Sequence, residues 1–95
     1  MARILLDETN ALAASESVTH TLQLARGKKH FISVSGAGSV LVETAVGTDT
    51  NFIPQTTISG GSASVILELP SVQQIRLTET TGVSAVVATL TSLED

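Results

Sequence analysis

The sequence predicts a small all-β protein, an antiparallel β-sandwich of jelly-roll or Greek-key type with about eight short strands. Apolar and polar residues alternate in short runs from residue 17 onward, and turn residues separate these runs at spacings of about ten. The chain is rich in Val, Thr and Ser, and Phe31 and Phe52 are its two aromatic residues. Side chains branched at Cβ favour extended strands because their χ1 angle is restricted. A small open barrel is the alternative, but short strands with one apolar face each favour the sandwich.

The first sixteen residues are the least regular part of the chain and precede the sandwich domain of residues 17–95. We expect them to form an N-terminal arm or the first edge strand. Asp7 to Asn10 could instead cap a short helix over residues 11–14, although alanine-rich helices of this length are marginal in water. Ile4, Leu5 and Leu6 are adjacent and cannot all face one side of a strand. An arm laid over a neighbouring subunit would bury all three.

Eight strands are predicted in the rest of the chain, at residues 17–25, 30–35, 39–46, 51–53, 55–58, 63–69, 73–79 and 83–90. Turns rich in glycine separate several of them. Pro54 and Pro70 are expected to end strands, because proline has no N–H group to donate to a sheet ladder. Within the third predicted strand, Val40, Val42 and Val46 are expected to share one side.

Composition limits the kinds of partner. The net charge is −4 and the pI is about 4.9, which argues against nucleic acid, whose phosphates need clustered Lys and Arg. No apolar run is long enough to span a bilayer, and the N-terminus lacks the features of a signal peptide. The chain is therefore expected to be made in a cytoplasm. The chain has 95 residues and no cysteine, so its core is small and it has no disulfides. Domains of this size commonly gain stability by associating with other copies.

Nothing in the sequence selects a catalytic, cofactor or metal site. His20 and His30 could lie on adjacent strands and face each other, but no third ligand stands at a telling spacing, so we interpret them as ordinary strand residues. The Gly36–Ser39 stretch lacks the ending of a phosphate-binding loop and is interpreted as a turn. Glu43, Glu68 and Arg76 are assigned to outward strand positions, where cross-strand ion pairing is the expected role of charged side chains. The protein is accordingly predicted not to be an enzyme.

Three groups of residues are candidate contacts with a partner or with other copies of the chain. One is the basic turn at Arg26, Lys28 and Lys29, which would complement an acidic neighbour. Another is Phe52 with Ile53, which could plug one end of the sandwich or anchor a subunit contact. The third is the apolar N-terminal group Ile4, Leu5 and Leu6.

The stretch from residue 31 to residue 90 also has a recognisable order of segments. An apolar strand leads to Gly-x-Gly, then to Val-x-Val-Glu-x-x-Val-Gly, an Asn-Phe-x-Pro loop and a Gly/Ser-rich connection. An apolar strand, Ile-Arg-Leu-Thr, a Thr-Gly turn and a Val/Ala-rich strand follow. This order resembles the small β-sandwich modules of tailed-bacteriophage virion proteins, such as head-decoration proteins and fibres. The likeness covers about two-thirds of the chain and lies in the order of these segments rather than in a fixed motif.

The resemblance implies a non-enzymatic virion protein without cofactors, often trimeric, that docks on a capsid or tail protein of the same particle. A capsid decoration subunit is therefore the expected function, located in the virion and acting as a homo-oligomer. The alternative is a receptor- or glycan-binding module of a phage tail or fibre. The scarcity of aromatic residues counts against the alternative, because sugar sites usually present Trp or Tyr.

Overall fold

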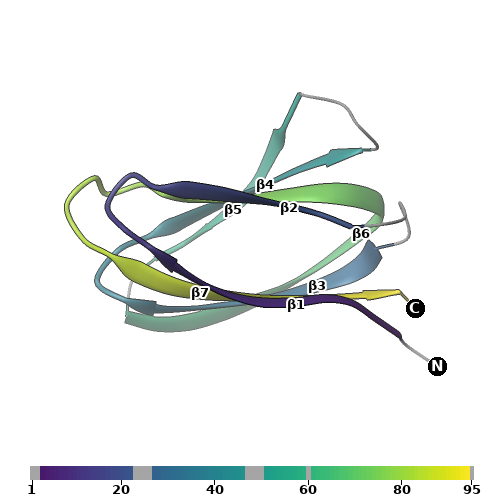
Figure 1. Ribbon diagram of the computed structural model, residues 1–95, viewed down its shortest axis with the longest axis horizontal. Coiled ribbons are helices and arrows are strands. Elements are labelled where there is room, and N and C mark those ends of the chain that lie inside the picture. Colours follow the sequence, from purple (N-terminus) through teal and green to yellow (C-terminus); the bar gives the residue numbers. More distant parts are fainter. Residues whose placement is uncertain (1–2, 23–26, 47–50, 60, 95) are drawn as a thin grey trace.

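The computed structural model describes residues 3–22, 27–46, 51–59 and 61–94. This part of the chain contains seven strands and no helix. The strands are β1 (Arg3–Leu12), β2 (Ser17–Thr21), β3 (Gly27–Gly36), β4 (Val40–Val46), β5 (Ile53–Ile58), β6 (Gly61–Glu79) and β7 (Val86–Glu94). All of their pairings are antiparallel, and the strands lie in two facing layers (Figure 1). The predicted β-sandwich is confirmed.

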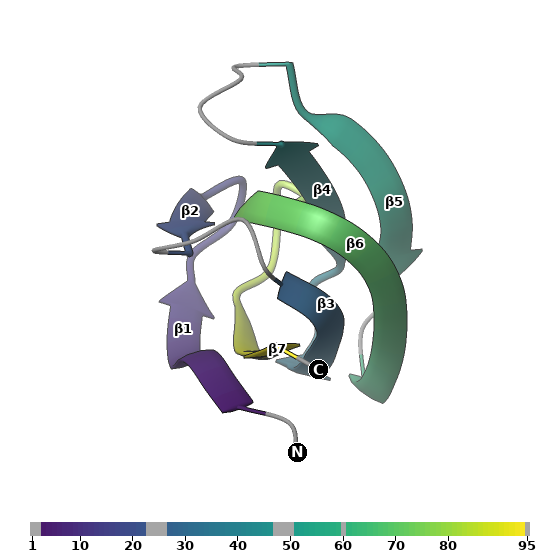
Figure 2. The same cartoon turned by 90° about the vertical axis from the view of Figure 1, so that its right-hand side faces the viewer.

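The long strand β6 belongs to both layers. Its residues 61–68 pair with β3, and its residues 74–79 pair with β4 on one side, and with β2 as far as Thr78 on the other. Figure 2 shows β6 arching from one layer to the other. The strand order is β1-β7-β3-β6 in the first layer, called the front sheet here, and β5-β4-β6-β2 in the second, the back sheet. Each sheet therefore has four strand segments.

The predictions that Pro54 and Pro70 end strands are both wrong, and Pro54 is the second residue of β5. Pro70 lies inside β6, at an irregularity of the ladder with β3. The register of that ladder runs to Glu68 opposite Lys29 and resumes at Val72, which lies opposite Gly27 of β3 and Val46 of β4. A missing N–H costs no ladder bond where the strand passes between sheets, so proline is compatible with this position.

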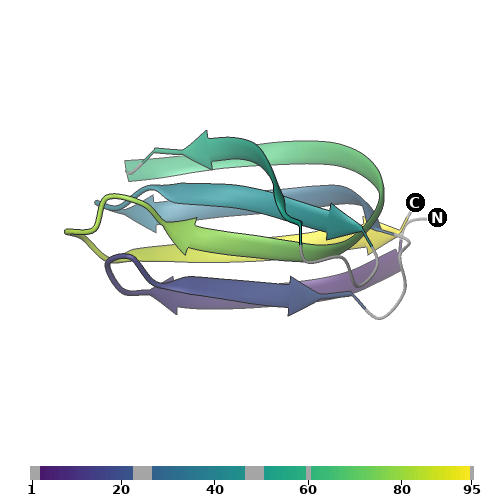
Figure 3. The same ribbon diagram turned by 90° about the horizontal axis from the view of Figure 1, so that it is seen from above.

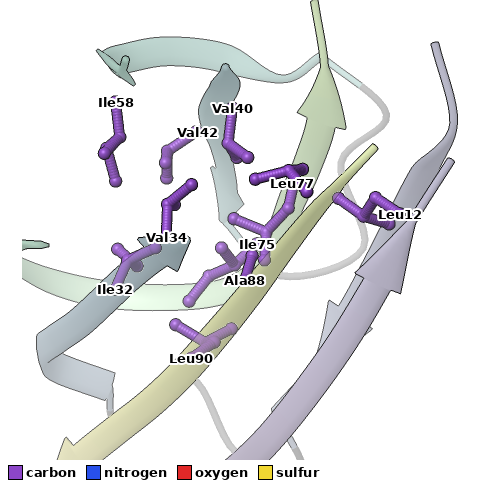
Figure 4. Close-up of a cluster of buried hydrophobic side chains, with 11 residues drawn as sticks. Leu12, Ile32, Val34, Val40, Val42, Ile58, Ile75, Leu77, Ala88 and Leu90 are labelled. Atoms are coloured by element: carbon purple, nitrogen blue, oxygen red, sulfur yellow. The ribbon is translucent and has the colours of Figure 1, made fainter. Parts of the chain in front are cut away.

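The core is built almost entirely from aliphatic side chains that point inward from both sheets (Figure 4). Its buried members are Leu12, Ile32, Val34, Val40, Val42, Ile58, Ile75, Leu77, Val86, Ala88 and Leu90. Alternation along the strands produces this arrangement, because successive side chains of a strand point to opposite faces. β7 shows it clearly: Val86, Ala88 and Leu90 are buried, whereas Val87 is exposed.

The N-terminal segment forms an edge strand. β1 pairs with β7 from Arg3 opposite Glu94 to Leu12 opposite Val86. The register shifts between Ile4 and Leu6, so these apolar neighbours need not share a face. Leu6 packs against the core, while Ile4 is 61% exposed. Residues 13–16 form a turn rather than the alternative short helix, with Ser15 at a positive φ of 64°.

A similar irregularity corrects the prediction for β4. Val40 and Val42 are fully buried, but Val46 is 60% exposed and does not share their side. The register with β6 shifts between Ala45, opposite Gln74, and Val46, opposite Val72, and Ala45 is buried. Strict alternation does not hold across such an irregularity of the ladder. Seen from above, the strands of both layers run along the long axis of the molecule (Figure 3).

Candidate ligand-binding face

The outer face of the front sheet carries rows of hydroxyl and apolar side chains. Ser33 of β3 lies opposite Ser64 of β6 and Thr89 of β7, and Thr89 lies opposite Thr9 of β1. These pairings bring side chains into one row across four strands, because directly opposed residues point to the same face. The Thr9 and Thr89 hydroxyl oxygens are 3.2 Å apart, within hydrogen-bond distance.

A second row lies beside the first. Phe31 is opposite Ile66 on one side and Thr91 on the other, and Thr91 is opposite Asp7. The Thr91 hydroxyl donates to the Asp7 Oδ1 atom at 3.1 Å. Phe31 is 37% exposed and Ile66 is 57% exposed, so an aromatic and an aliphatic side chain lie side by side on this face.

Shallow depressions follow β3 and β7 along this face. One of about 310 Å³ is lined by Ser33, Ser35, Ser64, Val87 and Thr89, among others. A second of about 260 Å³ shares three of these residues and adds Phe31, Ile66 and Thr91. We call this set the Ser/Thr face: Phe31, Ser33, Ser35, Ser64, Ile66, Val87, Thr89 and Thr91.

A third depression continues the Ser/Thr face toward one end of the sandwich. Its volume is about 490 Å³, it shares Ser35 and Val87 with the first, and Ala11, Ala13 and Ala85 are among its lining residues. Together the three extend along β3 from Phe31 to Gly36, six residues that span roughly 17 Å at the usual strand rise. The trough is therefore elongated and has hydroxyl groups at its centre and apolar groups toward both ends.

One buried carboxylate, Glu79, holds the turns at the end of the trough that is lined by Ala11, Ala13 and Ala85. Its Oε1 atom accepts hydrogen bonds from the backbone N–H groups of Ser15 and Gly82, at 3.1 and 2.9 Å. Its Oε2 atom accepts from the backbone N–H groups of Ser39 and Thr81, at 3.0 and 2.9 Å, and from the Thr81 hydroxyl at 2.7 Å. Three separate turns are thereby fastened to one side chain, which is 1% exposed.

The electrostatic state of Glu79 follows from these contacts. Burial opposes ionisation and by itself would raise the pKa. The hydrogen bonds from the Thr81 hydroxyl and from the backbone N–H groups of Thr81, Ser39 and Ser15 outweigh burial and lower the pKa to about 2. Glu79 is therefore ionised at neutral pH. It serves as an anchor for the turns rather than as a proton donor or acceptor in chemistry.

The outer face of the back sheet differs from the Ser/Thr face. Arg76 donates to the Oε1 atom of Glu43 from both Nε and Nη2, each at 2.9 Å. This contact is a cross-strand ion pair of the kind expected for outward charges. The Arg76 guanidinium also lies 4.2 Å from the centre of the Phe52 ring, a cation–π distance. Phe52 thus packs on a charged side chain of the sheet surface.

The candidate contact residues do not gather at one place. Ile4, Leu5 and Leu6 are on β1 of the front sheet, whereas Ile53 is on β5 of the back sheet and is 61% exposed. Lys29 lies on β3 opposite Glu68. Arg26 and the side chain of Lys28 lie outside the described residues.

The two histidines do not lie on paired strands, so the alternative in which they face each other is not realised. β2, which carries His20, pairs with β6, whereas the described part of β3, which carries His30, pairs with other residues of β6 and with β7. His20 Nε2 is 3.1 Å from the Asn10 Oδ1 atom, and His30 Nδ1 is 2.9 Å from the Ser92 Oγ atom in the interior. The described residues contain no group of three His, Asp or Glu side chains placed to hold a metal. They also include no helix with the length and apolar character that crossing a membrane demands.

Sequence reasoning missed the Ser/Thr face as a site. Its signal was present in the alternation of Phe31, Ser33 and Ser35, and in that of Val87, Thr89 and Thr91. Each run alone is an ordinary half-buried strand. Only the pairing of β3 with β7 and β6 shows that these hydroxyl groups share one surface.

No family model and no curated protein sequence matches this chain. Its fold, however, is that of solved family 29 carbohydrate-binding modules. A point variant of one such module has a TM-score of 0.70 at 12% identity, with 99% of this chain and 92% of that chain covered. Another variant has a TM-score of 0.69 at 11% identity, covering 100% and 91%.

Other structures of the same kind include ligand complexes. A variant complexed with cellulohexaose has a TM-score of 0.67 at 15% identity, covering 90% of this chain and 70% of that chain. At these identities the likeness establishes the fold alone, a jelly-roll-type β-sandwich.

Proposed function

We propose that this protein is a non-enzymatic carbohydrate-binding module whose ligand lies along the Ser/Thr face. The observation that carries the proposal is the elongated trough on the outer face of the front sheet, lined by Ser33, Ser64 and Thr89 and bordered by Phe31 and Ile66. The family 29 modules of the same fold, some of them in complex with hexasaccharides, support this choice of ligand class.

The chemistry of the face suits a sugar chain. Each serine or threonine hydroxyl can both donate and accept a hydrogen bond, as sugar hydroxyls do. The exposed Phe31 ring and the Ile66 side chain offer apolar area to the C–H face of a pyranose ring. The hydroxyl groups of Thr89 and Thr91 are already positioned by Thr9 and Asp7, which reduces the ordering that binding would require. A neutral oligosaccharide fits better than an anionic one, because Asp7 borders the face and the net charge is −4.

The two phenylalanines provide a matched test. Phe31 lies on the Ser/Thr face, and Phe52 lies on the back sheet against Arg76. Binding of neutral hexasaccharides, including cellulohexaose and mannohexaose, is to be measured by calorimetry on the wild type, Phe31→Ala and Phe52→Ala. Full burial of a phenylalanine side chain stabilises by about 1.5–3 kcal/mol. Since Phe31 is partly buried in the free protein, we expect its loss to weaken binding about tenfold.

Phe52→Ala should leave the affinity unchanged. The proposal fails if a broad glycan array shows no ligand, or if Phe52→Ala weakens binding and Phe31→Ala does not. Circular dichroism of both variants separates a lost contact from a lost fold.

A second candidate is the virion structural protein that the sequence resembles, docked as a homo-oligomer on a capsid or tail protein. Exposed apolar side chains away from the Ser/Thr face favour it: Ile53 is 61% exposed and Val83 is 81% exposed. Co-sedimentation with purified phage particles tests this candidate. Bound protein that is released by Ile53→Asp or Val83→Asp would support it, and absence from the particle fraction would exclude it.

A further inference from the structure

The stretch of β6 over residues 61–68 is an open sheet edge. Within the part of the chain that the structure describes, these residues pair with β3 on one side and with no strand on the other. Alternate N–H and C=O groups along this stretch therefore point away from the sheet. Such a row of unpaired groups is a template for another strand, and proteins usually protect it.

The other three sheet edges have such protection. β1 carries the charges of Asp7 and Glu8 and has a register shift near its start. β2 is only five residues long. β5 contains Pro54 and pairs with β4 through another register shift. Short length, charge, proline and bulges are the usual devices that prevent unwanted pairing.

The open edge of β6 lacks these devices. Its sequence, Gly-Ser-Ala-Ser-Val-Ile-Leu-Glu, has no proline and no lysine, and its one charge, Glu68, stands at the end. Eight residues match the length of an ordinary strand. Ile66 is 57% exposed on the outer face, while Val65 and Leu67 are half-buried and pack against the core. Val65 and Ile66 have high β-propensity, and the stretch is exposed with little charge, so it is suited to pair with another strand.

We propose that a second copy of this chain occupies the edge, by antiparallel pairing of residues 61–68 with the same residues of the partner about a two-fold axis. Two-fold pairing is the commonest symmetry of protein dimers, and an antiparallel edge is self-complementary under it. The axis would lie near Val65 and Ile66, at the middle of the open stretch.

Charge favours this occupant at this edge. With the axis near Val65 and Ile66, the two copies of Glu68 would be about 17 Å apart along the strands, at 3.4 Å for each residue. That separation exceeds the Debye length of about 8 Å at physiological ionic strength, so their repulsion is weak. Lys29, opposite Glu68 on β3, adds a compensating charge within the same sheet. Pairing through β1 would instead bring Asp7 and Glu8 of one copy close to those of another.

Such pairing would join two front sheets into one continuous sheet of eight strand segments. Ser64 and Ile66 line the depression nearest to this edge, so the Ser/Thr faces of the two copies would adjoin across the new ladder. The inference does not rest on the identity of the ligand. Were both copies to bind one polymer, the second contact would be intramolecular and the apparent affinity would rise.

The absence of cysteine from the chain allows a background-free test by single-cysteine scanning. Cysteine is placed in turn at positions 63 to 67, with Thr9→Cys on the β1 edge as the matched control. Each variant is oxidised at a concentration where light scattering shows the wild type at twice the chain mass of 9.8 kDa. We expect disulfide dimers to peak at one position near 65 or 66 and to fall several-fold at both of its neighbours. Thr9→Cys should remain uncrosslinked.

Two proline variants complete the test. Because alternate N–H groups point outward, either Ser64→Pro or Val65→Pro removes a donor from the open edge and leaves the β3 ladder intact. We expect that variant to fold and to be monomeric, and the other to lose the fold. A strictly monomeric wild type at millimolar concentration overturns the proposal, and monomers that bind an added extended peptide would assign the edge to another protein. An oligomer whose cross-links do not peak within 63–67 overturns it equally, including a trimer joined elsewhere.

Discussion

Gly38 provides the sharpest test of the way the turns are fastened. A Cβ atom added at Gly38 would lie 2.8 Å from the Glu79 Oε2 atom, 2.8 Å from the Ser84 carbonyl oxygen and 3.1 Å from the Glu79 Cγ atom. Contacts of this kind below 3.0 Å are essentially never found, so something must move. The carboxylate can move only by breaking its hydrogen bonds to the turns, and the Ser84 oxygen belongs to the backbone.

The magnitude follows from overpacking. Forcing extra atoms into a well-packed site costs about 1–3 kcal/mol. We expect Gly38→Ala to fall in the upper half of that range, about 2–3 kcal/mol, because one clash is with backbone and another is with a bonded carboxylate. For a domain of this size each kcal/mol lowers Tm by about 4–8 °C, so Tm should fall by roughly 8–24 °C.

Thermal and urea unfolding followed by circular dichroism at pH 7 measure the effect. Ala37→Ser, which adds one atom at the exposed neighbouring position, is the control and should change stability by less than about 0.5 kcal/mol. A Gly38→Ala protein that melts within about 3 °C of the wild type would refute the reasoning, since the close approach would then be relieved without cost. In a Glu79→Ala background the same substitution should be less destabilising, because the carboxylate that it displaces is absent.

Three further predictions concern Glu79, the ion pair of the back sheet and the core. The Glu79 pKa is about 2 when folded and near 4.5 otherwise, so its stabilising effect is complete above pH 4.5 and is lost as pH falls toward 2. Glu79→Gln should be less stable than the wild type at pH 7, because its amide brings a donor against N–H donors, and its urea midpoint should depend less on pH between 5 and 2. A double-mutant cycle of Glu43→Ala and Arg76→Ala should give a coupling free energy of about 0.5–1 kcal/mol, since the Arg76 side chain is 35% exposed. The coupling should fall in 1 M salt, and a coupling above about 2 kcal/mol would contradict a solvent-screened pair. Leu77→Ala, at a fully buried position, should cost about 2–5 kcal/mol in urea unfolding, and a loss under 1 kcal/mol would mean that the site collapses without leaving a cavity.

Alternation of apolar and polar residues was enough to predict the fold class and most of the core. Ile75 and Leu77 are buried and Arg76 faces outward, as a period of two requires. The prediction failed where the backbone departs from that period. Val46 is exposed just beyond the register shift after Ala45, and the long strand through Pro70 serves two sheets. Neither event has a local sequence signal strong enough to locate it, because both depend on the partner strand.

The candidate site was less predictable than the fold. It consists of ordinary serines and threonines that become a surface only when β6, β3 and β7 are aligned. Nothing in the sequence distinguishes its anchor, Glu79, from the other acidic residues of the chain. Its five hydrogen bonds come from turns far apart in the sequence, at Ser15, Ser39 and residues 81–82. Long-range contacts of this kind are set by topology and cannot be obtained from local spacing.

Because β6 belongs to both sheets, it also determines the order in which the strands can pair during folding. A chain cannot complete either sheet early, because β6 is needed by both and its partners in β2 and β3 precede it by roughly thirty to sixty residues. β1 waits longest, since Arg3 pairs with Glu94 at the other end of the chain. The entropy cost of closing loops of this length comes before the contacts that offset it. Folding is therefore slow, on the order of milliseconds to seconds for such topologies. On a ribosome, β1, β2 and β3 would emerge without partners. The β4–β5 hairpin can pair first, and the other strands can pair only when β6 and β7 appear.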